Sequence, residues 1–213
     1  MAYKFKALVV DDMPQMVKSF DIYQKYLKVK KNIDIDFKAI HSEEDYDENE
    51  AFDILLVDYN LKHGFFNNDK TLGNQFIESF RKKNKISKII FYSSEFEYDV
   101  DAKRYKFNFP AKEIFNLIND LQVDKIAAKD NFNMMLEVIA ECCEELDIVP
   151  LILSRTLSQY KEKDISVTYT DLEGEEIEVA SLLEDIMKDS KRGRAFKEQL
   201  VETVMTVLFN YKY

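Results

Sequence analysis

Short apolar runs alternate, over the first two-thirds of the chain, with segments in which apolar positions recur every three or four residues. The runs predict β-strands at 5–10, 34–40, 53–58, 88–93 and 123–128. The recurring positions predict helices near 14–31, 72–84, roughly 96–121 and 131–146, and the acidic stretch 42–50 predicts a short exposed helical turn. Elements that alternate in this way indicate an α/β fold built on a five-stranded, doubly wound parallel sheet.

The pattern changes after this sheet. The elements expected in the remainder are a helix, a hairpin and two more helices, at 150–163, 165–179, 181–190 and 194–210. Pro150 suits the first turn of a helix, the turn residues 171–174 predict the hairpin, and Gly193 is expected to separate the last two helices. We therefore expect two domains, residues 1–146 and a small helical or α+β region at 147–213.

The last predicted helix carries an apolar stripe. Its members are Leu200, Val201, Val204, Met205, Val207, Leu208 and Phe209. A stripe at helical spacing indicates a buried face, so we expect it to belong to a core or to the interface of a homodimer.

Charge narrows the range of partners. The formal net charge is −10, and residues 140–213 carry 9 basic and 16 acidic side chains, a net charge of −7. Affinity for nucleic acid depends on neutralising phosphates, and a DNA-binding output domain needs a basic recognition helix. Nucleic acid is therefore not an expected partner.

Cysteine usage and hydropathy bear on the compartment. The only cysteines are the neighbours Cys142 and Cys143, which rules out a framework of disulfides. The apolar runs are too short to span a membrane, and the N-terminus lacks the apolar core of a signal peptide. These features predict a cytoplasmic protein with no membrane partner.

Acidic side chains stand where two of the predicted strands end. Asp11 and Asp12 follow the first strand, and Asp58 ends the strand at 53–58. In doubly wound sheets the ligand site lies beyond the carboxyl ends of the strands. Three carboxylates there repel one another unless a cation joins them, and Mg²⁺ is the hard ion that oxygen ligands favour. The sequence therefore predicts a magnesium site.

Four short motifs, each at the end of a predicted strand, suggest a family. They are Val10-Asp11-Asp12, Val57-Asp58, Tyr92-Ser93-Ser94 and Ala128-Lys129. In this order they resemble the receiver domain of bacterial response regulators, over about residues 4–146. The resemblance implies a flavodoxin-like fold for that part of the chain.

The resemblance also implies a role for each matching residue. Asp58 would accept a phosphoryl group, and Asp12 and Asp58 would bind Mg²⁺ directly. The backbone carbonyl of Asn60 would be a third ligand, with Asp11 acting through water. Lys129 would supply a cation to one phosphoryl oxygen.

The hydroxyl of Ser93 would donate a hydrogen bond to another phosphoryl oxygen, although Ser94 leaves the register open by one residue. Asn60 and Glu95 match a pair that helps to hold the attacking water in chemotaxis-type receivers, which would imply fast self-dephosphorylation. Ordinary loop polarity explains the same two residues equally well.

Several positions depart from the family. Asp130 stands where a proline is usual, and Ile126 where an aromatic switch residue is common. Ser93 and Lys129 are separated by 35 residues, more than a fourth helix needs. The aromatic residues of this insert are expected either to pack into the core from an extended helix or to form a partner surface. The loop 61–72, with Phe65-Phe66, is also expected to contact another surface, either that of the kinase or that of the C-terminal region.

Together these features favour a phosphorylation-dependent response regulator that is not an enzyme beyond accepting and losing its own phosphoryl group. A sensor histidine kinase or a phosphotransfer protein would donate the phosphate, and a downstream protein would read it by direct contact. Two alternatives stay open. One is a transcription regulator that binds DNA, and the other is a pseudo-receiver that serves as a scaffold without being phosphorylated.

Overall fold

A computed structural model describes residues 3–48, 50–61, 72–99, 101–171 and 174–210. The chain divides into two compact units, Met1–Leu146 and Asp147–Tyr213. Among the described helices, none combines the length and the apolar character needed to cross a membrane. The predicted contact at Phe65-Phe66 lies outside the described residues.

The first unit is built on a five-stranded sheet. Its strands are β1 (Lys4–Val10), β2 (Asp34–Ile40), β3 (Ile54–Asp58), β4 (Lys88–Ser93) and β7 (Lys125–Ala128). They lie in the order β2-β1-β3-β4-β7, and every neighbouring pair is parallel. This is the strand order of flavodoxin-like, doubly wound sheets, so the predicted fold class is confirmed.

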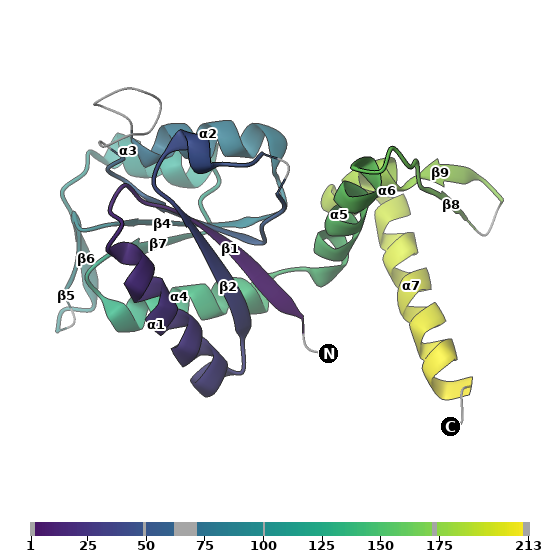
Figure 1. Ribbon diagram of the computed structural model, residues 1–213, viewed down its shortest axis with the longest axis horizontal. Helices are drawn as coiled ribbons and strands as arrows, with labels where there is room; N and C mark the ends of the chain where they lie inside the picture. The colour runs from purple at the N-terminus through teal and green to yellow at the C-terminus, as the bar shows by residue number, and fades with distance from the viewer. Residues whose placement is uncertain (1–2, 49, 62–71, 100, 172–173, 211–213) are drawn as a thin grey trace. The chain divides into compact units, whose positions relative to one another are not determined.

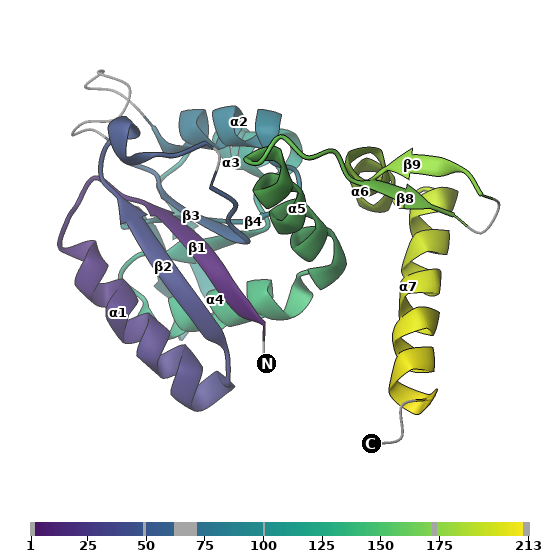
Figure 2. The same cartoon turned by 45° about the vertical axis from the view of Figure 1, so that its right-hand side comes forward.

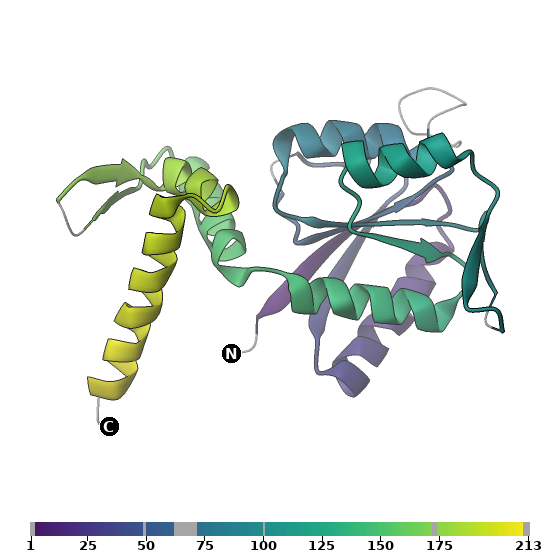
Figure 3. The same cartoon turned by 180° about the vertical axis from the view of Figure 1, so that it is seen from behind.

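Helices cover both faces of this sheet. They are α1 (Met16–Tyr26), which continues as a π-helical turn (Leu27–Lys31), α2 (Gly73–Lys83), α3 (Ala111–Phe115), which continues as a π-helical turn (Asn116–Asp120), and α4 (Phe132–Glu145). Figure 1 shows α2 and α3 on one face and α1 and α4 on the other, and Figure 3 shows the same arrangement from behind. All five residues of β3 are buried as a result, which is why its sequence is a continuous apolar run.

The prediction of one long helix at 96–121 is wrong. The segment begins instead with an antiparallel hairpin of β5 (Phe96–Asp99) and β6 (Arg104–Phe107). The hairpin register places Glu97 opposite Lys106, and their charged groups lie 3.9 Å apart. Aromatic residues two apart and an oppositely charged pair are the pattern of a hairpin, whereas the sequence prediction had assumed helical spacing.

The sheet register brings distant residues to one edge. Val10 is paired with Val57, Asp58 with Tyr92, and Ser93 with Ala128. The residues that follow these pairs therefore emerge together at the carboxyl ends of the strands.

The second unit contains α5 (Ile148–Lys161), β8 (Thr168–Thr170), β9 (Glu176–Glu178), α6 (Val179–Met187) and α7 (Lys191–Asn210). The two strands form an antiparallel hairpin, as Figure 2 shows. Its core is small and centres on Ile177, Leu182 and Ile186.

The predicted helix break at Gly193 is wrong, because Gly193 lies inside α7. The chain turns earlier, at Asp189, which has a φ of 48°. A Cβ on Gly193 would lie 2.4 Å from the carbonyl oxygen of Asp185 in α6. The glycine therefore permits close packing of the two helices rather than ending one of them.

The apolar stripe of α7 does not belong to a core. Each of its seven members is exposed, from 36% at Leu200 to 73% at Phe209. The core alternative is therefore wrong for this stripe, and the dimer alternative stays a prediction.

We predict that Gly73→Ala destabilises the first unit. A Cβ at this first residue of α2 would lie 2.1 Å from the carbonyl oxygen of Asp58 and 2.8 Å from Cγ1 of Val57. Overpacking of this kind costs about 1–3 kcal/mol or more, which urea denaturation would measure. Glu78→Ala, an exposed change on the same helix, should stay within about 0.5 kcal/mol of wild type. Equal unfolding free energies for the two variants would contradict the prediction.

Candidate functional site

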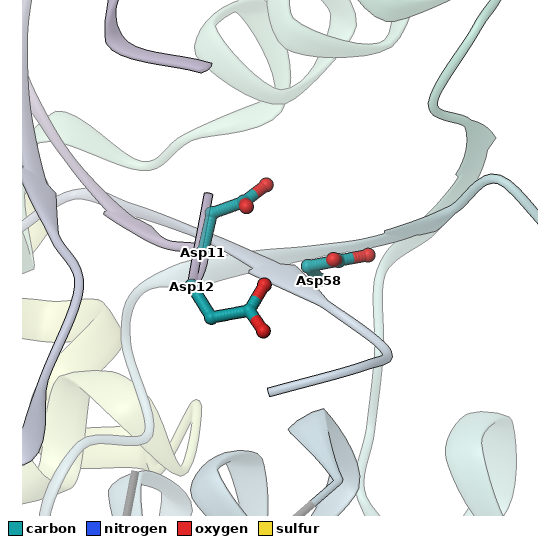
Figure 4. A group of neighbouring side chains, drawn as sticks. All are labelled: Asp11, Asp12 and Asp58. Carbon is teal, nitrogen blue, oxygen red and sulfur yellow. The ribbon is translucent and has the colours of Figure 1, made fainter. Parts of the chain in front are cut away.

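Three carboxylates meet at the carboxyl edge of the sheet. Asp11 and Asp12 follow β1, and Asp58 is the last residue of β3. One oxygen from each lies within 4.8 Å of one from each of the others. Figure 4 shows the carboxyl groups of Asp11 and Asp12 on the side that faces Asp58. Asp11 and Asp58 are buried and Asp12 is half-buried.

A lysine from another strand end reaches into this group. Lys129 follows β7, and its Nζ lies 2.9 Å from Oδ2 of Asp11 and 2.9 Å from Oδ2 of Asp58. The side chain of Lys129 is only 9% exposed. This ammonium thus lies against two buried carboxylates, with the carboxylate of Asp12 beside them, and acids placed so closely repel one another unless a cation joins them.

The surroundings shift the pKa values of Asp58 and Lys129. Burial raises the pKa of Asp58 to about 6, although the ammonium of Lys129 acts in the opposite direction. Burial would lower the pKa of Lys129, but the charges of Asp58 and Asp11 raise it above its usual value. The lysine therefore stays a cation, while the ionised form of Asp58 needs further compensation.

Asp11 is held from several directions. Its Oδ1 accepts a hydrogen bond of 2.9 Å from the backbone N–H of Met13, and its Oδ2 accepts one of 2.7 Å from the hydroxyl of Tyr92. The Nδ1 of His41, just after β2, lies 2.7 Å from the backbone carbonyl oxygen of Asp11. Asp11 is consequently fixed in orientation.

The other predicted residues border the acids. Ser93 is the buried last residue of β4, and its Oγ accepts a hydrogen bond of 3.1 Å from the backbone N–H of Glu95. Its carbonyl oxygen accepts one of 3.0 Å from the backbone N–H of Lys129. Asn60, two residues after Asp58, donates from Nδ2 to Oε1 of Glu95 at 3.4 Å.

Aromatic residues of the insert pack beside the site. Tyr59, the residue after Asp58, lies edge to face with Phe109 at a centroid distance of 4.4 Å and with Phe91 at 5.9 Å. Phe96 is 2% exposed and lies 4.9 Å from Phe109. Phe96 and Phe109 therefore pack into the core, which was one of the two alternatives expected for the insert. Phe96 reaches the core from a β-hairpin and not from the expected long helix. Phe115 differs, with 63% exposure.

The acids and the lysine selected from the sequence are thus brought together. The contacts of Tyr92 and His41 with Asp11 were missed. The sequence does contain a signal that Tyr92 makes a polar contact. A tyrosine stands near the end of an otherwise apolar strand, and a buried hydroxyl needs a hydrogen-bond partner. His41 carries no comparable local signal, since its contact depends on the register of β2.

No protein-family model and no curated protein matches the sequence. Among solved structures, the chain is similar to the BeF3-activated DrrB receiver domain, with 15% identity and a TM-score of 0.46 over 67% of this chain and 100% of that one. It is also similar to a CheY-like receiver domain protein from Methanospirillum hungatei JF-1, with 19% identity and a TM-score of 0.46 over 67% and 96%. A third is the isolated REC domain of RcsB from Salmonella enterica serovar Typhimurium, with 14% identity and a TM-score of 0.47 over 68% and 92%.

These three structures are receiver domains of response regulators. The fold of this chain is defined by its own strand order and parallel register.

The raised pKa of Asp58 predicts a pH-dependent stability without metal. Native Asp58, with a pKa of about 6, binds its proton more tightly than the unfolded chain, where the pKa is the usual 3.8. The contribution of Asp58 to stability is therefore lost as the pH rises from about 4 to 6, by about 3 kcal/mol. Urea denaturation in EDTA should show Asp58→Asn gaining stability relative to wild type across this window.

The exposed aspartate Asp21 on α1 supplies the control for this titration. Asp21→Asn, which replaces an exposed carboxylate outside the site, should not show this gain. If Asp58→Asn also kept a constant difference from wild type between pH 4 and 7, the pKa assignment would be wrong.

Proposed function

We propose that this chain is a phospho-receiver of two-component signal transduction, in which Asp58 accepts a phosphoryl group. The observation that supports this most directly is the buried bridge from Lys129 to both Asp58 and Asp11, beside a third carboxylate. A structural ion pair needs one acid for its lysine. Here one ammonium contacts two buried carboxylates and a third carboxylate has an oxygen within 4.8 Å of theirs, an arrangement that suits a site for a divalent cation.

The proposed transfer needs one new bond and one broken bond. A carboxylate oxygen of Asp58 attacks the phosphorus of a phosphohistidine or an acyl phosphate, and the bond from phosphorus to the donor breaks. The leaving group takes the electron pair, and Asp58 becomes an aspartyl-phosphate. Mg²⁺, held by Asp12, Asp58 and the backbone carbonyl of Asn60 with Asp11 acting through water, would neutralise charge on the transferring phosphoryl oxygens.

Lys129 and Ser93 are proposed to receive the new group. Phosphorylation adds about −1.5 to −2 charges at neutral pH, which would draw the ammonium of Lys129 from Asp11 and Asp58 toward a phosphoryl oxygen. The buried hydroxyl of Ser93 would donate to another oxygen while its Oγ still accepts from the backbone N–H of Glu95. The pair of Asn60 and Glu95 would hold the water that removes the phosphate.

The partners belong to the proposal as well. A sensor histidine kinase or phosphotransfer protein would supply the phosphoryl group in the cytoplasm, and a downstream protein would respond to it. DNA is a weaker candidate, because residues 140–213 carry a net charge of −7. Three of the four basic residues of α7 are also engaged, since Arg192 pairs with Asp185, Arg194 with Asp189, and Lys197 with Asp147.

We predict that the wild-type chain, incubated with Mg²⁺ and acetyl phosphate, gains the mass of one phosphoryl group. Asp58→Asn should gain none, because an amide is not a nucleophile for this reaction. Asp21→Asn, which removes an exposed carboxylate elsewhere, should be labelled like wild type. Intact-protein mass spectrometry measures all three. Unchanged mass in the wild type, with Mg²⁺ bound, would favour the scaffold alternative.

The stripe of α7 is proposed to be the interface of a homodimer. Seven of the ten residues from 200 to 209 are apolar and exposed, and Glu202 is the single charged residue among them. Two copies of the stripe could pair with little charge repulsion even though each chain carries a charge of −10.

Sedimentation velocity at increasing protein concentration tests this interface. Wild type should shift toward a dimer, and Leu208→Glu should stay monomeric because it would place a charge within the stripe. Thr203→Glu adds the same charge on the polar side of α7 and should dimerise like wild type. A wild-type chain that remains monomeric throughout, or dimerisation that survives Leu208→Glu, would contradict the assignment.

A further inference from the structure

The hydroxyl of Tyr92 lies inside the acidic site without belonging to the set of residues that the proposed function uses. Tyr92 is the penultimate residue of β4 and has no exposed surface. Its hydroxyl donates a hydrogen bond of 2.7 Å to Oδ2 of Asp11, a carboxylate that is also fully buried. The Nζ of Lys129 lies 2.9 Å from this same oxygen and 5.6 Å from the centre of the Tyr92 ring.

We infer that Tyr92 is a positioning residue, which holds Asp11 in the orientation that the divalent-cation site requires when Lys129 turns away. The inference rests on the proposed function and deepens it, because it assigns a role to a residue outside the acids, the lysine and the serine. It concerns orientation and not contact with the cation.

Asp11 shares one of its hydrogen-bond donors, the ammonium of Lys129, with Asp58. Oδ2 of Asp11 has two donors, the hydroxyl of Tyr92 and the ammonium of Lys129, while Oδ1 has the backbone N–H of Met13. Lys129 divides its charge between Asp11 and Asp58. A divalent cation bound to these carboxylates repels the ammonium, and an anionic group placed on Asp58 competes for it, so Asp11 loses its share just when the site is loaded.

Loss of a hydrogen-bond donor costs a fully buried carboxylate free energy and weakens the control over its orientation. Tyr92 and the N–H of Met13 remain in place, and each fixes a different oxygen of Asp11. The phenol is suited to this because it is neutral, so it adds no charge that would oppose a divalent cation. Burial, together with the charges of Asp11 and Asp58, raises the pKa of Tyr92 well above its ordinary value, which keeps the hydroxyl a donor.

The ring of Tyr92 is anchored independently of its hydroxyl. It lies 6.4 Å from the ring of Phe20 in α1, and the strand pairing fixes its backbone between β3 and β7. Tyr92→Phe therefore removes the donor to Asp11 while it keeps the aromatic packing. The matched control is Tyr23→Phe, which removes a hydroxyl from another buried tyrosine whose ring also lies against Phe20, at 5.4 Å.

Isothermal titration calorimetry with Mg²⁺ alone tests the inference in the full-length chain. Residues that orient metal ligands through hydrogen bonds typically contribute 10–100-fold to metal affinity, so we expect Tyr92→Phe to raise the Kd for Mg²⁺ about tenfold. Tyr23→Phe should match wild type. With acetyl phosphate, the Tyr92→Phe chain should need about tenfold more Mg²⁺ for half-maximal labelling, and saturating Mg²⁺ should restore the wild-type rate.

The outcomes separate the inference from the proposed function. An unchanged Kd in Tyr92→Phe, or a chain that no longer folds by circular dichroism, would overturn the positioning role, since the hydroxyl would then serve the fold alone. A wild type that binds Mg²⁺ without being labelled would overturn the phospho-receiver, and the Kd comparison would still decide the role of Tyr92. Absence of Mg²⁺ binding by the wild type would overturn both.

Discussion

The candidate site of the first unit depends on one constraint, the burial of the carboxylates of Asp11 and Asp58 beside the ammonium of Lys129. Taking carboxylates out of water is expensive, and their attraction to Lys129 offsets this cost only where the geometry is good. The sheet supplies that geometry, because the parallel register of β1, β3, β4 and β7 delivers the acids and the lysine to one edge. The fold thus keeps a group of charges together that would separate in solvent.

The central sheet and its acids could be predicted because both follow from local rules. Strands that are buried on both faces read as continuous apolar runs, and parallel strands end on the same side. Asp11 and Asp58 therefore had to lie close together once their strands were recognised. β2, at the edge of the sheet, instead alternates polar and apolar residues, which is typical of a strand with one face exposed.

The parts that could not be predicted depend on contacts between distant segments. Aromatic residues between 96 and 109 fit a helix or a hairpin equally well until the pairing of Glu97 with Lys106 is recognised. Gly193 resembles a helix break, but only the approach of α6 explains why no side chain is tolerated there. The bond from Tyr92 to Asp11 joins residues 81 positions apart, and no local pattern encodes that pairing.

The packing around Tyr59 has a mechanical consequence. Tyr59 is covalently next to Asp58, and its ring is wedged edge to face between Phe91 and Phe109. Closely packed interiors rearrange between discrete arrangements and do not deform smoothly. A displacement of Asp58 would therefore shift the ring of Tyr59 against Phe109 in one discrete step. Phe96 of β5, which packs against Phe109, would shift with it.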